Sequence, residues 1–161
     1  MHNIPDTKSK QTILVIDDTP ENLSVINALL REFYQVKVST SGVDGLNVAQ
    51  MQSQPDLILL DIMMPDIDGY EVCRQLKANP VTENIPVIFL TAKIHMEDEQ
   101  RGFDVGAVDY IVKPISPPIV LARIQTHLFL KDQRRFLEYQ VEQRTREIAL
   151  IQDVTLSLIH I

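Results

Sequence analysis

Five short apolar runs alternate along the chain with longer stretches in which apolar residues recur at helical spacing. Three of the runs, TILVI, DLILL and PVIFL, are almost continuously hydrophobic, which is typical of strands buried on both faces of a parallel sheet. The run QVKVS alternates between polar and apolar residues and predicts an edge strand with one face in water. The five predicted strands are Thr12–Ile16, Gln35–Ser39, Asp56–Leu60, Pro86–Leu90 and Val108–Val112.

The stretches that follow these runs predict helices. Thr19-Pro20 is typical of an N-cap followed by proline at the first helical position, and apolar residues from Leu23 to Leu30 then share one face. The other predicted helices are Gly42–Ser53, one that begins at Asp68-Gly69 and stops at Asn79-Pro80, Met96–Val105, and one that begins at Pro117. Strand and helix alternate five times, which predicts an α/β fold with a parallel sheet between layers of helices.

Composition narrows the class of protein. The 161 residues suffice for one domain and an extension, and 45% hydrophobic with 23% charged residues is typical of a globular chain. A net charge of −7 argues against direct nucleic-acid binding, which needs a basic surface. The single cysteine, Cys73, excludes an intrachain disulfide. Neither a signal peptide nor an apolar segment of about 20 residues is present, so we expect a cytoplasmic protein without a membrane span.

Each of four predicted strands is followed by a polar side chain. Asp17 and Asp18 follow the first strand, Asp61 the third, Thr91 the fourth and Lys113 the fifth. Each has an ordinary explanation by itself; the two neighbouring aspartates, for example, would also suit the N-terminus of a helix. Because the carboxyl ends of parallel strands meet at one edge of the sheet, we expect these five side chains to share one crevice.

Such a cluster suits phosphoryl transfer. Three neighbouring carboxylates repel one another, and Mg²⁺ relieves the repulsion while keeping room for water and a phosphoryl oxygen. Lys113 would supply a second positive charge, and the Thr91 hydroxyl could donate to another phosphoryl oxygen. Asp61 is then the expected nucleophile, which would form an aspartyl phosphate.

The motifs that carry these residues resemble the receiver domains of two-component response regulators. The matching segments, between about Gln11 and Leu130, are ILVIDDTPEN, LILLDIMMPDIDGYEVC, PVIFLTA and GFDVGAVDYIVKP. The resemblance implies a CheY-like, flavodoxin-like fold: a five-stranded parallel sheet of order 2-1-3-4-5 with five helices, here followed by a long C-terminal helix. It also implies a phosphohistidine donor on a sensor histidine kinase or a phosphotransfer protein.

The resemblance assigns a metal site to the same crevice. It implies that Asp61 is the phosphoacceptor and that Asp18 and Asp61 ligate Mg²⁺, with Asp17 acting on the metal largely through water. The backbone carbonyl of Met63 would be a further ligand, and the Met63 side chain would lie at the mouth of the site.

The resemblance also assigns a switch. Lys113 and Thr91 would assist catalysis, and Thr91 with Tyr110 would form the switch pair: Thr91 moves to the phosphoryl group and Tyr110 turns inward. The signal would pass through the face made by the fourth helix, the fifth strand and the fifth helix. Beyond its own phosphorylation and dephosphorylation, no enzymatic activity is expected of the domain.

We divide the chain into a flexible N-terminus (1–10), a receiver domain (11–130) and a helical linker (131–161). Apolar residues at heptad spacing favour a dimeric coiled coil in this linker, interrupted by Arg134 and Arg144, whereas the alternative is a single exposed helix. A homodimer through the signalling face and this helix is therefore expected. The heptad residues are Leu130, Leu137, Val141, Ile148, Ile151, Thr155 and Leu158.

Two alternative functions stay open. The segment VEQRTREIALIQDVTLSL resembles linkers to output domains, especially HD-GYP phosphodiesterases of cyclic di-GMP, and also those of diguanylate cyclases and hybrid kinases. The chain has none of the motifs of these outputs and ends on LIHI without a helix cap, so we expect it to be the regulatory portion of a longer protein. A phosphatase or nucleotide-binding domain of similar fold is disfavoured, because no glycine-rich phosphate loop follows the first strand.

Overall fold

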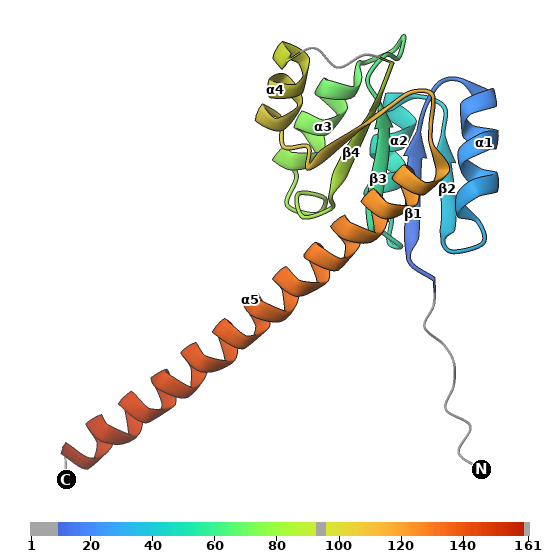
Figure 1. Ribbon diagram of the computed structural model, residues 1–161. Coiled ribbons are helices and arrows are strands. Elements are labelled where there is room, and N and C mark those ends of the chain that lie inside the picture. The colour runs from blue at the N-terminus through green and yellow to red at the C-terminus, as the bar shows by residue number, and fades with distance from the viewer. Residues whose placement is uncertain (1–9, 93–95, 160–161) are drawn as a thin grey trace, which may run out of the picture. The chain divides into compact units, whose positions relative to one another are not determined.

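The computed structural model describes residues 10–92 and 96–159, so the predicted flexible N-terminus lies, apart from Lys10, outside the described residues. Strands and helices alternate along this chain as the sequence pattern predicts (Figure 1). In chain order the elements are β1 (Thr12–Ile16), α1 (Pro20–Leu30), β2 (Gln35–Ser39), α2 (Gly42–Ala49), β3 (Leu57–Asp61), α3 (Gly69–Ala78), β4 (Val87–Thr91), α4 (Met96–Asp104), β5 (Asp109–Val112) and α5 (Pro117–Ile159).

The five strands form one parallel sheet of order β2-β1-β3-β4-β5, which confirms the predicted fold and strand order. The edge strand β2 is the most exposed of the strands, as its alternating pattern indicated, whereas every residue of β1, β3 and β4 is buried. Because all strands run the same way, their carboxyl ends lie along one edge of the sheet.

Buried hydrophobic side chains lie on both faces of the sheet. On one face, alternate residues such as Leu60 and Phe89 pack with buried residues of α2 and α3, among them Leu46, Val72 and Leu76. Side chains alternate between the faces along a strand, so the intervening buried residues of β1, β3 and β4 point to the other face. Helices lie on both sides of the sheet (Figure 1).

Several boundaries differ from the prediction by a few residues: β5 begins at Asp109 instead of Val108, and α4 ends at Asp104 instead of Val105. Strands β3 and β4 lie one residue later than expected, so Asp61 and Thr91 are the last residues of their strands instead of the residues that follow them. Helix α2 ends at Ala49 rather than at Ser53, because the N–H of Gln50 turns back onto the carbonyls of Asn47 and Val48. The residues after it are exposed, including the apolar Met51, so no buried side chain holds another helical turn on the sheet.

The helix N-termini differ in how they are capped. The Asp68 side chain accepts a hydrogen bond of 2.9 Å from the Glu71 N–H and caps α3. Thr19 occupies the predicted N-cap of α1, but its side chain makes no capping hydrogen bond. Proline at the first position of α1 removes one N–H that would otherwise need a partner.

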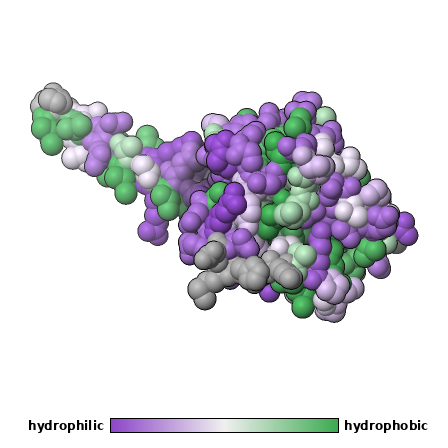
Figure 2. All heavy atoms as spheres, turned by 90° about the horizontal axis from the view of Figure 1, so that it is seen from above, coloured by the Kyte–Doolittle hydropathy of each residue, from purple (hydrophilic) through white to green (hydrophobic). Residues whose placement is uncertain are grey.

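The described chain forms two compact units that meet after Gln125. The first unit contains the sheet, and the second, from Thr126, consists of the remainder of helix α5. Hydrophobic and hydrophilic side chains are mixed along this second unit (Figure 2). Among the described residues, none of the helices is apolar over a length that could span a membrane.

Candidate functional site

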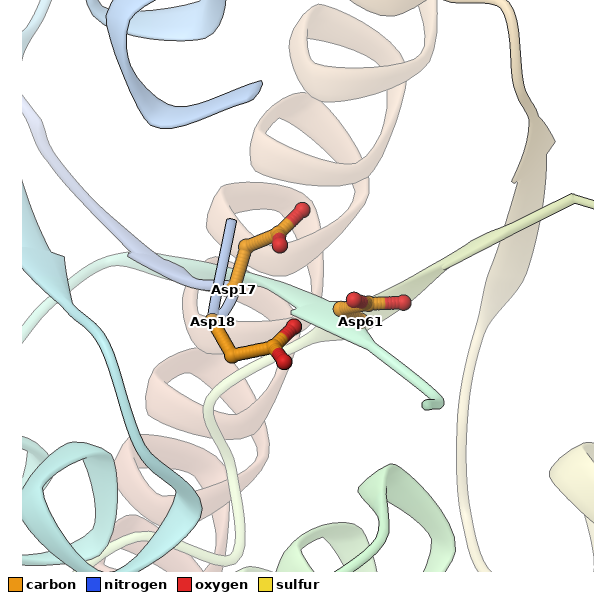
Figure 3. Close-up of side chains that lie close together, drawn as sticks. All are labelled: Asp17, Asp18 and Asp61. Atoms are coloured by element: carbon orange, nitrogen blue, oxygen red, sulfur yellow. The ribbon is translucent and has the colours of Figure 1, made fainter. Parts of the chain in front are cut away.

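Three aspartates converge at the carboxyl edge of the sheet. Asp17 and Asp18 directly follow β1, Asp61 ends β3, and β1 pairs with β3. One carboxylate oxygen from each lies within 4.8 Å of the others, an arrangement able to hold a metal ion. Figure 3 shows the three side chains leaving these strand ends toward the same space. Asp17 and Asp61 are buried and Asp18 is half-buried, so the cluster is open to solvent on the side of Asp18.

Asp17 is the most constrained of the three carboxylates. It is fully buried and accepts hydrogen bonds from the Thr19 N–H at 2.9 Å and from the Asn22 side chain at 3.3 Å. Its other neighbour is the Lys113 ammonium, 3.2 Å away. Our sequence analysis missed Asn22; its signal was a polar residue one turn into α1, just after the two aspartates.

Lys113 connects the first, third and fifth strands. Its Nζ lies 3.2 Å from an Asp17 oxygen and 3.5 Å from an Asp61 oxygen. Its backbone N–H donates to the Thr91 carbonyl at 2.7 Å, which brings the ends of β4 and β5 together. Thr91 itself is buried at the end of β4. The side chains expected at four strand ends therefore do lie along one edge.

The pKa of Asp61 reflects its burial and, second, the negative charge of Asp17 beside it. Burial and the neighbouring charge of Asp17 raise the pKa of Asp61 from 3.8 to about 6, although Lys113 and the Met63 N–H lower it. Added positive charge near such a carboxyl group would stabilise its ionised form and lower its pKa. A divalent cation among the three aspartates would provide that charge.

Hydrogen bonds of Met63 and Asp66 fix the loop between β3 and α3. The Met63 N–H points to an Asp61 carboxylate oxygen at 3.3 Å, and the Met63 side chain is 78% exposed at the edge of the site. Farther along, Asp66 accepts hydrogen bonds from the N–H groups of Gly42 and Val43 at 3.2 and 3.0 Å, so this loop residue caps α2. The sequence carries no local signal for this contact between distant segments.

Close approach requires glycine where this loop enters α3. A Cβ on Gly69 would lie 2.4 Å from the Asp61 carbonyl oxygen and 2.8 Å from the Ile62 Cα. The Gly69 N–H donates to the Ile62 carbonyl at 2.8 Å. The glycine therefore lets α3 begin directly against the strand end that carries Asp61.

Tyr110 lies inside the domain rather than on its surface. It is buried on β5, its ring is 5.6 Å from that of Phe89, and its hydroxyl donates to backbone carbonyls of α4. In this structure Tyr110 therefore points into the domain, against α4 and Phe89.

Comparison with known proteins places the chain among receiver domains. The model of the response regulator receiver domain family matches residues 13–125. A Vibrio cholerae protein described as a probable cyclic di-GMP phosphodiesterase is 44% identical over 159 residues, which is 94% of this chain and 36% of that protein. The chain thus spans about a third of this relative.

Solved structures show the same fold. The chemotaxis protein CheY4 of Vibrio cholerae is 27% identical with a TM-score of 0.70, over 73% of this chain and 98% of that one. The receiver domain of the sensor histidine kinase PA1611 of Pseudomonas aeruginosa is 31% identical with a TM-score of 0.69, over 74% of this chain and 98% of that one. That structure contains a magnesium ion coordinated in its active-site cleft.

Proposed function

The chain belongs to the response regulator receiver domain family of two-component signalling, and we propose that it is a switch that accepts a phosphoryl group on Asp61. The proposed donor is a phosphohistidine of a sensor kinase or a phosphotransfer protein. The observation that carries the proposal is the cluster of Asp17, Asp18, Asp61 and Lys113 at one sheet edge. Within it, Asp61 ends its strand and combines a raised pKa with a neighbouring ammonium group.

The residues present fit a magnesium ion. The carboxylates of Asp18 and Asp61 are the proposed ligands, and Asp17 would act through water. The backbone carbonyl of Met63, two residues after Asp61, is proposed as a third ligand. When bound, Mg²⁺ supplies positive charge for the phosphoryl oxygens. The raised pKa of Asp61 supports this fit, since it reports a buried negative charge that the protein alone neutralises incompletely.

The chain's own groups have distinct parts in the transfer. An Asp61 oxygen forms the new bond to phosphorus as the bond from phosphorus to the donor's histidine nitrogen breaks, and the electron pair of that bond stays on the imidazole. Lys113, held by Asp17, is placed to neutralise a phosphoryl oxygen. The Thr91 hydroxyl is the proposed donor to another oxygen, and with Tyr110 it would link the site to the face of α4, β5 and α5.

Intact mass spectrometry tests this function directly. The protein is incubated with acetyl phosphate and Mg²⁺, beside an Asp61→Asn variant and a control Asp68→Asn variant that changes only the α3 cap. One added phosphoryl group is expected in the unmodified protein and the control, and none in Asp61→Asn or without Mg²⁺. Equal labelling of Asp61→Asn would exclude Asp61 as the acceptor.

The proposed route of the signal is a homodimer through the α4, β5 and α5 face and the C-terminal helix. On the described part of α5 the heptad side chains form an exposed apolar stripe, which a second copy of the helix would cover. Two intrahelical ion pairs, Arg134 with Glu138 and Arg146 with Glu142, accompany it. The exposed heptad residues are Leu130, Leu137, Val141, Ile148, Ile151 and Leu158.

Sedimentation tests the dimer. Ile148→Glu and Ile151→Glu place charge in the proposed seam, whereas Ser157→Glu adds the same charge outside it. Monomers are expected for the first two variants and dimers for the control and the unmodified chain. Sedimentation of the unmodified, phosphorylated chain as a monomer would contradict the proposal.

The alternative function is the regulatory part of an enzyme of cyclic di-GMP turnover. It is favoured by the similarity to the Vibrio cholerae relative, which covers 94% of this chain and therefore includes much of α5. Because the chain spans 36% of that relative, the remaining length could hold an output domain. The reading frame that encodes the protein decides this: an HD-GYP motif downstream of residue 161 would support it.

A further inference from the structure

Helix α4 packs on the domain with few buried side chains. Of the α4 residues whose side chains the structure describes, 98–104, only Gly102 is buried. Phe103, the large apolar residue of this stretch, is 43% exposed and meets the Tyr110 ring edge-on at 5.5 Å. In Figure 1, α4 lies beside α3. The burial of aliphatic side chains, which holds α1 and α3, is therefore not what holds this part of α4.

The Tyr110 hydroxyl contacts the backbone of α4 instead. It donates to the Asp98 carbonyl at 2.6 Å, with the Glu99 carbonyl 3.0 Å away, and the Gly102 N–H hydrogen-bonds to the same hydroxyl. Asp98 and Gly102 are four residues apart, the spacing of one rung in the hydrogen-bond ladder of an α-helix. The phenol hydroxyl thus contacts both the carbonyl and the N–H that are paired at this position in a regular α-helix.

Only glycine leaves room for this contact. A Cβ on Gly102 would lie 1.6 Å from the Tyr110 hydroxyl oxygen and 2.5 Å from the adjoining ring carbon. It would also lie 3.1 Å from a ring carbon of Phe89. Any other residue at position 102 would therefore exclude the tyrosine from its inward place or push α4 away from the sheet.

A second tyrosine supports the same attachment. The Tyr70 hydroxyl lies 3.3 Å from the Asp98 carbonyl, and the Arg101 guanidinium stacks over the Tyr70 ring at 4.2 Å. Burial and the neighbouring Tyr70 raise the pKa of Tyr110 to about 12, although the Gly102 N–H lowers it. The Tyr110 hydroxyl therefore keeps its proton, and can donate, at physiological pH.

We propose that Gly102 is a positioning residue: the space above it admits the Tyr110 hydroxyl into the backbone of α4, so that inward placement of Tyr110 and docking of α4 are one event. The link from this contact to signalling rests on the proposed function, whereas the contact between Tyr110 and α4 does not. The contact itself involves only residues of this chain, so it can be tested without a phosphoryl donor. Departure of the ring would remove the main attachment of α4 and loosen a helix of the proposed output face.

Amide hydrogen exchange over residues 98–106, measured without a phosphoryl donor, tests the inference. Tyr110→Phe removes only the hydroxyl and is expected to speed exchange in this segment about tenfold. Tyr139→Phe, which removes the hydroxyl of an exposed tyrosine on α5, is the matched control and should leave the segment unchanged. No acceleration in Tyr110→Phe would overturn the role of the hydroxyl.

Gly102→Ala gives the sharper result, because the two possible effects have opposite signs. Alanine favours helix over glycine, so a residue without a special contact should exchange more slowly after the substitution. We expect exchange over 98–106 to become at least tenfold faster, since the Cβ displaces the tyrosine. Slower or unchanged exchange in that segment would refute the proposal, provided that exchange in β1 and β3 shows an intact sheet.

A second background separates this mechanism from general destabilisation. In a Tyr110→Ala background there is no ring to displace, so adding Gly102→Ala should slow exchange in α4 instead of speeding it. Acceleration in both backgrounds would overturn the proposal. Phosphorylation is scored separately by mass: failure of Asp61 to take a phosphoryl group would defeat the proposed function and leave these exchange results valid.

Discussion

Asp61→Asn is expected to make the metal-free domain more stable at neutral pH, although it removes the proposed acceptor. Folding buries Asp61 beside Asp17 and raises its pKa from 3.8 to about 6. A carboxyl group with a raised pKa favours the folded state in its protonated form, so stability falls as the pH rises from about 4 through about 6. Asparagine is a neutral replacement and can still accept the Met63 N–H.

The size of the effect follows from the pKa. At about 1.4 kcal/mol per pKa unit, the shift from 3.8 to about 6 corresponds to a penalty of about 3 kcal/mol above pH 6. The Lys113 ammonium remains paired with Asp17 at 3.2 Å after the substitution. The gain should therefore be about 3 kcal/mol at pH 7.5 and close to zero at pH 4.

Urea unfolding in EDTA at several pH values between 4 and 8 measures this difference, with Asp68→Asn as the control because asparagine caps a helix about as well as aspartate. Addition of Mg²⁺ should stabilise the unmodified protein more than Asp61→Asn, since the proposed ligand set requires the ionised carboxylate. A gain that does not vary with pH, or a variant less stable than the parent at pH 7.5, would refute the electrostatic reasoning.

Three further predictions concern single residues. Lys113→Met removes the ammonium beside the acceptor and should slow labelling by acetyl phosphate at least tenfold while Mg²⁺ still binds, as seen by timed mass spectra and a metal titration. Gly69→Ala should destabilise the fold by about 2 kcal/mol or more, because its Cβ meets backbone atoms; Gly45→Ala, whose Cβ meets the buried Ile16 side chain and no backbone atom, should cost less in the same urea assay. Asp68→Ala should cost about 1 kcal/mol by loss of a cap, and Thr19→Ala close to nothing, since that side chain makes no capping bond; equal losses would contradict this.

Much of the fold could be predicted from local patterns. Continuous apolar runs such as Leu57–Leu60 can be buried only between two layers of helices, and the alternation of strands with helices then requires parallel pairing. Parallel pairing in turn places Asp17, Asp61, Thr91 and Lys113 at one edge. For this reason the sequence alone could predict which residues meet at this edge, although the ends of two strands were misplaced by one residue.

The contacts that the tertiary structure alone decided join a side chain to the backbone of a distant segment. Asp66 caps α2 from the loop after β3, and the Tyr110 hydroxyl reaches Asp98 and Gly102 in α4. Periodicity reports which face of an element is buried, but it carries no information about which carbonyl or N–H a loop or helix will present there. Those partners depend on the path of the loops and on how closely two elements approach. At Gly102 that approach is set by the absence of a single carbon atom.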